Sequence, residues 1–281
     1  MRERPPVADP LPRPVVDSHC HLDVVDRHLG EGPGPDDALA LAREAGITRV
    51  VQVGCDVASS QWAADFAGAR ADVLAAVALH PNDAPRILER EGRSGLEAAY
   101  DAIEALAAMP RVRAIGETGL DYYRTRGDDA QAVQHESFRR HIDIAKRNDR
   151  TLVIHDRDAH ADILRILDEE GAPDRVVFHC FSGDAEMARH CADRGWLCSF
   201  AGVVTYKNAD GLREALRGLP REAILVETDA PYLTPVPHRG AVNASYLVPL
   251  TVRAMADVRS QSLEQLCDDL WSNSERAFGP L

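Results

Sequence analysis

The stretch TLVIHDRDAHADILRILDEEGAPDRVVFH, residues 151–179, decides the fold class because it contains one complete strand–helix–strand unit. It begins with a short aliphatic run that is typical of a strand buried on both faces. Residues 158–170 then place Ile and Leu on one helical stripe, and Gly171 follows as a stop signal. A second aliphatic run, residues 176–179, closes the unit. The pattern predicts two parallel strands joined by a crossover helix.

The same pattern recurs along the chain. Helical stretches are predicted at residues 36–45, 131–147 and 185–194, and the first and last of them are followed by Gly. Eight aliphatic runs are predicted to be strands: residues 15–19, 49–54, 73–80, 112–117, 151–155, 176–179, 196–200 and 224–229. Alternating strands and helices predict an α/β fold with a parallel sheet, either doubly wound and open or closed. The count of eight favours a (β/α)8 TIM barrel.

Composition sets the domain and compartment expectations. No composition break divides residues 15–281, so we expect one barrel domain. The six cysteines form no C-x-x-C pair, which favours a reduced, cytoplasmic protein. No apolar run has membrane-spanning length, so we expect no membrane partner. Residues 1–14 are rich in Pro and Arg and lack the apolar core of a signal peptide, and we expect a flexible tail without an assigned role.

Charge restricts the possible partners. The chain has 45 acidic and 32 basic residues, which gives a net charge of −13. Such a balance argues against a broad electrostatic grip on nucleic acid. It leaves open a local basic cleft, or an acidic site whose charge metal ions neutralise.

Residues of the kinds that bind metals lie almost entirely at the ends of the predicted strands. In His19-Cys-His21, both imidazoles point to the same face of a strand and can reach one ion. Each residue alone has an ordinary explanation, since isolated H-x-H pairs are common and strand-end His and Asp often cap or turn the chain. Their joint position at the carboxyl ends of barrel strands favours a metal site. The candidate ligands are His19, His21, Glu117, His155, His179 and Asp229.

The chain resembles the TatD family of metal-dependent deoxyribonucleases, whose barrel is amidohydrolase-like. The similar motifs are VDSHCHLD at residues 16–23, LHP at 79–81, IGETGLDYY at 115–123, IHDRDA at 154–159, FHCFSG at 178–183, ETDAPYL at 227–233 and NSERAFG at 273–279. They occur in order and at family spacing from about residue 15 to residue 279. Phosphotriesterase-like and dihydroorotase-like enzymes instead carry a carbamylated Lys at the end of strand four. Glu117 stands there in this chain, which favours the TatD branch.

The resemblance implies a hydrolase, specifically a phosphodiesterase or deoxyribonuclease acting as a 3′–5′ exonuclease on single-stranded DNA or 3′ ends. It also implies that His80 lines the substrate cleft, although a turn role before Pro81 is the competing interpretation. One loop departs from the family: where members often read Arg-Gly-Lys-Arg-Asn-Glu-Pro, residues 239–245 read Arg-Gly-Ala-Val-Asn-Ala-Ser. This departure puts the substrate preference in doubt.

We expect two divalent metal ions as cofactors, Mg²⁺, Mn²⁺ or Zn²⁺, because oxygen and imidazole ligands suit all three. In this hypothesis, His19, His21 and Asp229 bind one ion, and His155 and His179 bind the other. Glu117 bridges the ions. A water bridging them would be the nucleophile, and Asp229 would orient it and accept its proton.

Basic and aromatic residues of the loops after the strands are the substrate-binding candidates. They are Arg157, Tyr123, Arg124 and Arg239, which suit a single strand with stacked bases and paired phosphates. A surface salt bridge is the competing interpretation for Arg157, and exposed Tyr and Arg also occur without function.

Two further functions remain open at this point, because one barrel fold hosts many chemistries. The site also suits hydrolysis of a small phosphoester, amide or lactone, to which the net charge of −13 gives weight. A non-catalytic metal-binding partner protein is the alternative from another class. The expected oligomeric state is a monomer or a small homo-oligomer.

Overall fold

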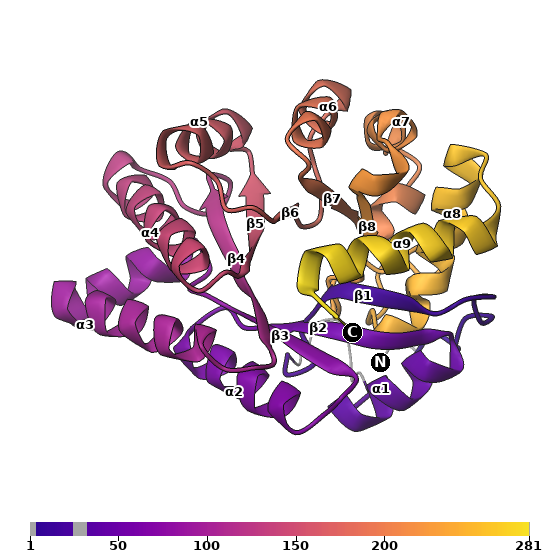
Figure 1. Ribbon diagram of the computed structural model, residues 1–281, viewed down its shortest axis with the longest axis horizontal. Helices are drawn as coiled ribbons and strands as arrows, with labels where there is room; N and C mark the ends of the chain where they lie inside the picture. The colour runs from indigo at the N-terminus through magenta and orange to yellow at the C-terminus, as the bar shows by residue number, and fades with distance from the viewer. Residues whose placement is uncertain (1–3, 25–32, 281) are drawn as a thin grey trace. The chain divides into compact units, whose positions relative to one another are not determined.

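The computed structural model describes residues 4–24 and 33–280, and Figure 1 shows its alternating strands and helices. The strands are β1 (Val15–Cys20), β2 (Ile47–Val53), β3 (Val73–Val77), β4 (Val112–Asp121), β5 (Thr151–Arg157), β6 (Val176–Phe178), β7 (Leu197–Phe200) and β8 (Ile224–Val226). The α-helices are α1 (Pro35–Glu44), α2 (Val57–Gly68), α3 (Asp83–Ala107), α4 (Asp128–Arg147), α5 (His160–Glu170), α6 (Ala185–Asp193), α7 (Asp210–Gly218), α8 (Val248–Arg259) and α9 (Leu263–Phe278). Short 3-10 helices are η1 (Gly202–Thr205), η2 (Arg221–Ala223) and η3 (Ser245–Leu247).

The predicted (β/α)8 class is confirmed. The strands follow one another in the sheet in their chain order, from β1 to β8. Within each unit, the described strand pairs are parallel, as crossover helices require. The chain divides into two compact units, Met1–Gln52 with Cys180–Leu281, and Val53–His179.

The first unit contains β1, β2, β7 and β8. Strands β1 and β2 pair in parallel, as do β7 and β8. Helix α9 packs against both β1 and β8. Backbone bonds also join the end of β1 to the segment after β8: the Asp229 N–H donates to the His19 carbonyl at 2.9 Å, and the His21 N–H donates to the Ala230 carbonyl at 2.8 Å. The two segments that carry predicted ligands are therefore held side by side.

The second unit contains β3 to β6, which pair in sequence as parallel strands. Strand β3 is completely buried, which accounts for its unbroken aliphatic sequence. Helix α4 packs against β4, and α3 lies beside α4 (Figure 1). The buried face of α4 includes Phe138 and Ile142, which the sequence places at helical spacing.

The strand ends differ from the sequence prediction in two ways. Strands β4 and β5 continue past Glu117 and His155, because their ladder extends to the pair Asp121 and Arg157. Strands β6 and β8 instead stop one residue before His179 and three residues before Asp229. Some predicted ligands therefore lie within a strand and others in the loop that follows.

Local sequence signals account for several helix ends. Helix α2 begins with a capping box, in which Asp56 accepts from the Ser59 N–H at 2.7 Å and the Ser59 hydroxyl accepts from the Asp56 N–H at 3.0 Å. Helix α5 ends directly before Gly171, and helix α6 ends two residues before Gly195; each glycine has a φ of 71°. These glycines adopt the left-handed backbone region that the predicted stop signals require.

The described part of the N-terminal segment, residues 4–14, packs against other parts of the first unit. The Leu11 N–H donates to the Ala45 carbonyl at 3.1 Å, and the Tyr246 hydroxyl donates to the Pro5 carbonyl at 3.2 Å. Arg253 of α8 donates to the Pro10 carbonyl at 3.1 Å. Residues 1–3 of the expected tail lie outside the described residues.

In residues 4–24 and 33–280, no helix combines the length and the apolar composition that a bilayer crossing needs. The cytoplasmic location stays a prediction.

Candidate metal centre

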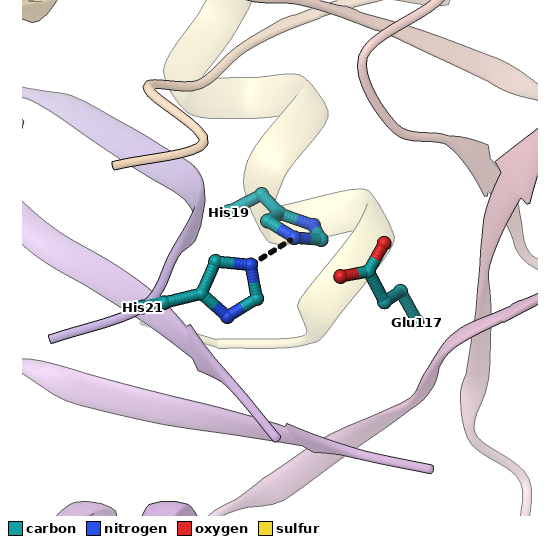
Figure 2. Close-up of side chains that lie close together, drawn as sticks. All are labelled: His19, His21 and Glu117. Atoms are coloured by element: carbon teal, nitrogen blue, oxygen red, sulfur yellow. Dashed lines mark hydrogen bonds between the residues drawn. The ribbon is translucent and has the colours of Figure 1, made fainter. Parts of the chain in front are cut away.

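The first unit brings together the two histidines of the H-x-H motif. His19 lies on β1, His21 follows the strand, and both side chains are buried. Their Nε2 atoms are 3.3 Å apart, the contact drawn as a dashed line in Figure 2, which also shows Glu117 from β4. The predicted convergence of these two imidazoles is present.

Asp229 completes the histidine cluster of the first unit. Its Oδ1 lies 3.8 Å from His19 Nε2 and 3.5 Å from His21 Nε2. The Asp229 side chain is 16% exposed, whereas the two imidazoles are 0% and 5% exposed. A water molecule therefore has better access to the carboxylate than to either ring.

A buried carboxylate beneath this cluster fixes its backbone. Asp17 accepts hydrogen bonds from the Thr228 N–H at 2.9 Å, the Thr228 hydroxyl at 2.7 Å and the Ser245 hydroxyl at 2.7 Å. Burial raises the pKa of Asp17 to about 6, against the opposing effect of these bonds. Asp17 thus joins β1 to the residue that precedes Asp229.

The second unit brings together Glu117, His155 and His179. Glu117 Oε2 lies 2.9 Å from His155 Nδ1 and 2.9 Å from His179 Nε2. The two ring nitrogens are 3.2 Å from each other. The three side chains offer ligand atoms that all lie within 4.8 Å of one another. Glu117 therefore has both imidazoles of this cluster on one of its oxygens, and its bridging role stays a prediction.

Electrostatics keep Glu117 ionised. Burial opposes the charged form, but the imidazoles of His179, His80 and His155 outweigh it and hold the pKa of Glu117 well below its usual range. Burial likewise opposes protonation of His155, yet its contacts with Asp121 and Glu117 raise its pKa. The cluster is a buried anion surrounded by imidazoles, an environment that suits a cation.

The donor spacing fits metal ions. Two donors on one ion at about 2.1 Å lie about 3.0–3.4 Å apart in octahedral or tetrahedral geometry. The separations of 3.3 Å between His19 Nε2 and His21 Nε2, and of 3.2 Å between His155 Nδ1 and His179 Nε2, fall in this range. Imidazole and carboxylate donors without thiolates suit Mg²⁺, Mn²⁺ and Zn²⁺.

His80 lies next to the Glu117 cluster. Its Nε2 is 3.8 Å from Glu117 Oε2, and its ring makes an edge contact with the His155 ring at 4.5 Å. Burial lowers the pKa of His80 to about 3, although Glu117 opposes this shift. The Asn82 N–H donates to Nδ1 at 3.1 Å, which assigns the ring proton to Nε2. His80 thus presents a neutral N–H donor next to the ligand cluster, and its substrate role stays a prediction.

Sequence reasoning missed three residues beside the second cluster. Asp121 Oδ2 lies 3.4 Å from His155 Nε2, and Asn82 Nδ2 donates to the same oxygen at 2.9 Å. The Cys55 thiol donates to Glu117 Oε1 at 3.4 Å. One signal was available for Asp121, because it follows Glu117 by four residues in β4. No local pattern in the sequence marks Cys55 or Asn82.

The predicted substrate residues lie in stacked pairs or at the surface. The Arg157 guanidinium lies over the Tyr123 ring at 4.0 Å, and Tyr123 is 54% exposed. The Arg239 guanidinium lies over the Tyr206 ring at 4.3 Å in the first unit. Arg124 is exposed, and its N–H donates to Asp121. An arginine above an aromatic ring is a preorganised cation beside a flat stacking surface.

Comparison with known proteins places this fold and these residues in context. The family model described as TatD related DNase matches residues 16–279. A metal-dependent hydrolase of Mycobacterium tuberculosis named TatD, described as uncharacterized, is 45% identical over 94% of this chain and 98% of its own length. The Escherichia coli metal-dependent hydrolase YcfH, also described as uncharacterized, is 38% identical over 94% of this chain and 95% of its own length.

A solved structure supports the fold. The crystal structure of YjjV, a TatD homologue from Escherichia coli, superposes with a TM-score of 0.82 at 24% identity, covering 95% of this chain and 98% of that one. The family model spans all six candidate ligands, and both relatives are covered almost end to end. The chain belongs to the TatD family of metal-dependent hydrolases.

Proposed function

We propose that this protein is a deoxyribonuclease that removes nucleotides from the 3′ end of DNA, using two divalent metal ions. One observation carries the proposal: each compact unit holds a pair of imidazoles at metal-ligand spacing, with a carboxylate beside the pair. In a (β/α)8 fold, the loops and strand ends that carry these clusters form the active face. His19, His21 and Asp229 would hold one ion, His155 and His179 the other, and Glu117 would bridge them. Two such ions would activate a water and offset the charge of the phosphodiester.

Side chains of the protein would carry out the proton transfer and bind the phosphate. Asp229 is the proposed proton acceptor, because its carboxylate lies beside the two imidazoles proposed to hold an ion and is the most exposed member of its cluster. The Nε2–H group of His80, beside Glu117, is the proposed donor to a phosphate oxygen. Glu117 stays ionised in its buried position and keeps its imidazole partners in place.

The substrate proposal rests on the stacked pairs. Tyr123 with Arg157, and Tyr206 with Arg239, each present a ring for a nucleobase and a cation for a phosphate. Base stacking on an aromatic side chain contributes about 1–3 kcal/mol per base. We expect Tyr123→Ala and Arg239→Ala to raise the KM for an oligonucleotide by roughly tenfold or more. Turnover of bis-nitrophenyl phosphate, which has no base sequence to stack, should change little.

The primary test is cleavage of an end-labelled single-stranded DNA oligonucleotide by purified protein with Mg²⁺ or Mn²⁺. A ladder that shortens from the 3′ end, disappears with chelator and disappears in Glu117→Ala would support the proposal. Fragments produced by internal cuts would contradict exonuclease action, although the protein would still be a nuclease. Exposed Asp210, whose ion pair is with its own helix neighbour Arg213, provides a control variant, Asp210→Asn, that should cleave normally.

A small-ester hydrolase is the second candidate, and the net charge of −13 is the observation that favours it. The loop at residues 239–245, with Arg239 as its one basic residue, also offers little positive charge to a polymer. Metal-dependent turnover of phosphoesters, amides or lactones without any DNA cleavage would select this candidate. Bound metal with no turnover of any of these substrates would instead favour a non-catalytic metal-binding protein.

A further inference from the structure

We infer that Asp121 is a positioning residue for the metal centre. It favours the tautomer of His155 that carries its proton on Nε2, which leaves the Nδ1 lone pair facing Glu117 and His179. The inference rests on the proposed metal centre and adds a residue to it. Asp121 lies at the end of β4 and is completely buried, as a carboxylate rarely is without a specific partner.

The two nitrogens of His155 face different groups. Nδ1 lies 2.9 Å from Glu117 Oε2 and 3.2 Å from His179 Nε2, on the side of the ligand cluster. Nε2 lies 3.4 Å from Asp121 Oδ2, on the opposite side. A neutral imidazole has one lone pair and one N–H. If Nδ1 gives its lone pair to an ion, Nε2 carries the proton. Nε2 has no regular hydrogen bond in the described residues, and Asp121 Oδ2 lies within ion-pair distance of it.

Asp121 is itself held on both oxygens. Asn82 Nδ2 donates to Oδ2 at 2.9 Å, and the Arg124 N–H donates to Oδ1 at 2.8 Å. The Asn82 side chain is fixed in turn by the Thr125 hydroxyl, which donates to its Oδ1 at 2.7 Å. The Asp121 backbone N–H donates to Gln134 Oε1 at 3.0 Å. These bonds oppose rotation of the carboxylate away from His155.

These bonds also keep Asp121 charged. Each of its oxygens accepts an N–H donor, one from Asn82 and one from the Arg124 backbone, and such bonds stabilise a carboxylate in its charged form. A negative charge 3.4 Å from Nε2 favours the proton on that nitrogen and makes Nδ1 a better electron-pair donor. The carboxylate thus increases the basicity of the nitrogen that faces the proposed ion.

A competing interpretation makes Asp121 a ligand. His80, Asp121 and His155 offer ligand atoms within 4.8 Å of one another, which is compatible with an additional ion. His155 would then have to bind through both nitrogens, which requires loss of its ring proton. Both Asp121 oxygens already accept N–H donors from the chain. The positioning role requires neither loss of the His155 ring proton nor displacement of these N–H donors.

The test is metal binding by Asp121→Asn, measured by calorimetry with Mn²⁺ and with Zn²⁺ on protein stripped with chelator. The variant keeps the shape of the side chain and removes its charge. We expect the dissociation constant of one ion to rise about 10–100-fold, the range found for partners of metal-bound histidines, with an unchanged number of ions bound. Asp162→Asn is the matched control, because Asp162 is a carboxylate of the same unit that accepts from the Tyr122 hydroxyl at 2.7 Å.

Three results would overturn the inference. Loss of one bound ion with unchanged affinity for the rest would make Asp121 a ligand. Unchanged metal affinity in Asp121→Asn would mean that Asp121 does not position His155. If Asp121→Asn lowered the melting temperature equally in metal-free and in metal-loaded protein, its role would be structural only. If Asp121→Asn does not fold, Asp121→Glu retains the charge, displaces the carboxylate and should also weaken binding. These measurements use no nucleic acid, so absence of DNA cleavage would contradict the proposed substrate and leave this inference standing.

Discussion

The buried His141 of α4 makes folding stability depend on pH. Its Nδ1–H donates to the Ser137 carbonyl at 2.7 Å, and its Nε2 accepts from the Leu79 N–H at 3.0 Å. Both nitrogens are committed, so protonation would place a second N–H against the Leu79 amide. Burial lowers the pKa of His141 to about 4, although the Ser137 carbonyl opposes the shift. The Leu79 amide directly precedes His80, so this bond also fixes the backbone next to His80.

The sign follows from comparing the two states. An unfolded histidine has a pKa of about 6.5, so the unfolded chain binds more protons between pH 6.5 and pH 4. The stability due to neutral His141 is complete above pH 6.5 and is lost as the pH falls toward 4. A shift from about 6.5 to about 4 corresponds to a loss of about 2 kcal/mol between pH 7 and pH 5, and about 3 kcal/mol by pH 4.

Urea unfolding of metal-free protein at a series of pH values tests this reasoning, with His141→Gln as the comparison. Groups common to both proteins cancel in the difference between their free energies of unfolding. We expect the variant to lose stability at pH 7, where its hydrogen bonds are poorer, and the gap to narrow by about 2 kcal/mol at pH 5. Parallel curves for the two proteins between pH 7 and pH 5 would refute the assignment.

Three further perturbations have defined outcomes. Asp17→Ala leaves the Thr228 N–H and two hydroxyls without their acceptor and should reduce the free energy of unfolding by about 3 kcal/mol, whereas Asp210→Ala at the surface should change it by less than about 0.5 kcal/mol in the same urea assay. Gly119→Ala should lower the melting temperature and weaken metal binding together, because φ is 138° and the added Cβ would overlap the His155 carbonyl oxygen; calorimetry that found either property unchanged would contradict this. Adding Mn²⁺ or Zn²⁺ at about 100 times its dissociation constant should stabilise the protein by about 2.7 kcal/mol, or about 5–10 °C in melting temperature, and an unchanged melting curve would argue against ions bound by the folded state.

The sequence determined the fold class and the identity of the candidate ligands. Aliphatic runs bounded by glycine stops are local signals, and they predicted all eight strands to within a few residues. The spacing of His19 and His21 is equally local, because strand geometry alone places both imidazoles on one face. These features depend on neighbours in the chain, which is why they can be read without coordinates.

Tertiary structure decided which groups support those ligands. Asp17 binds Thr228 across 211 positions, and Asn82 binds Asp121 across 39 positions, so no periodic pattern reveals either bond. The extension of β4 beyond Glu117 depends on continued pairing with β5, which no property of β4 alone specifies. The hydrogen-bond partner of a buried polar group depends on which groups the tertiary structure brings next to it. An unpaired buried group costs free energy, so a partner is present even when it lies far away in the sequence.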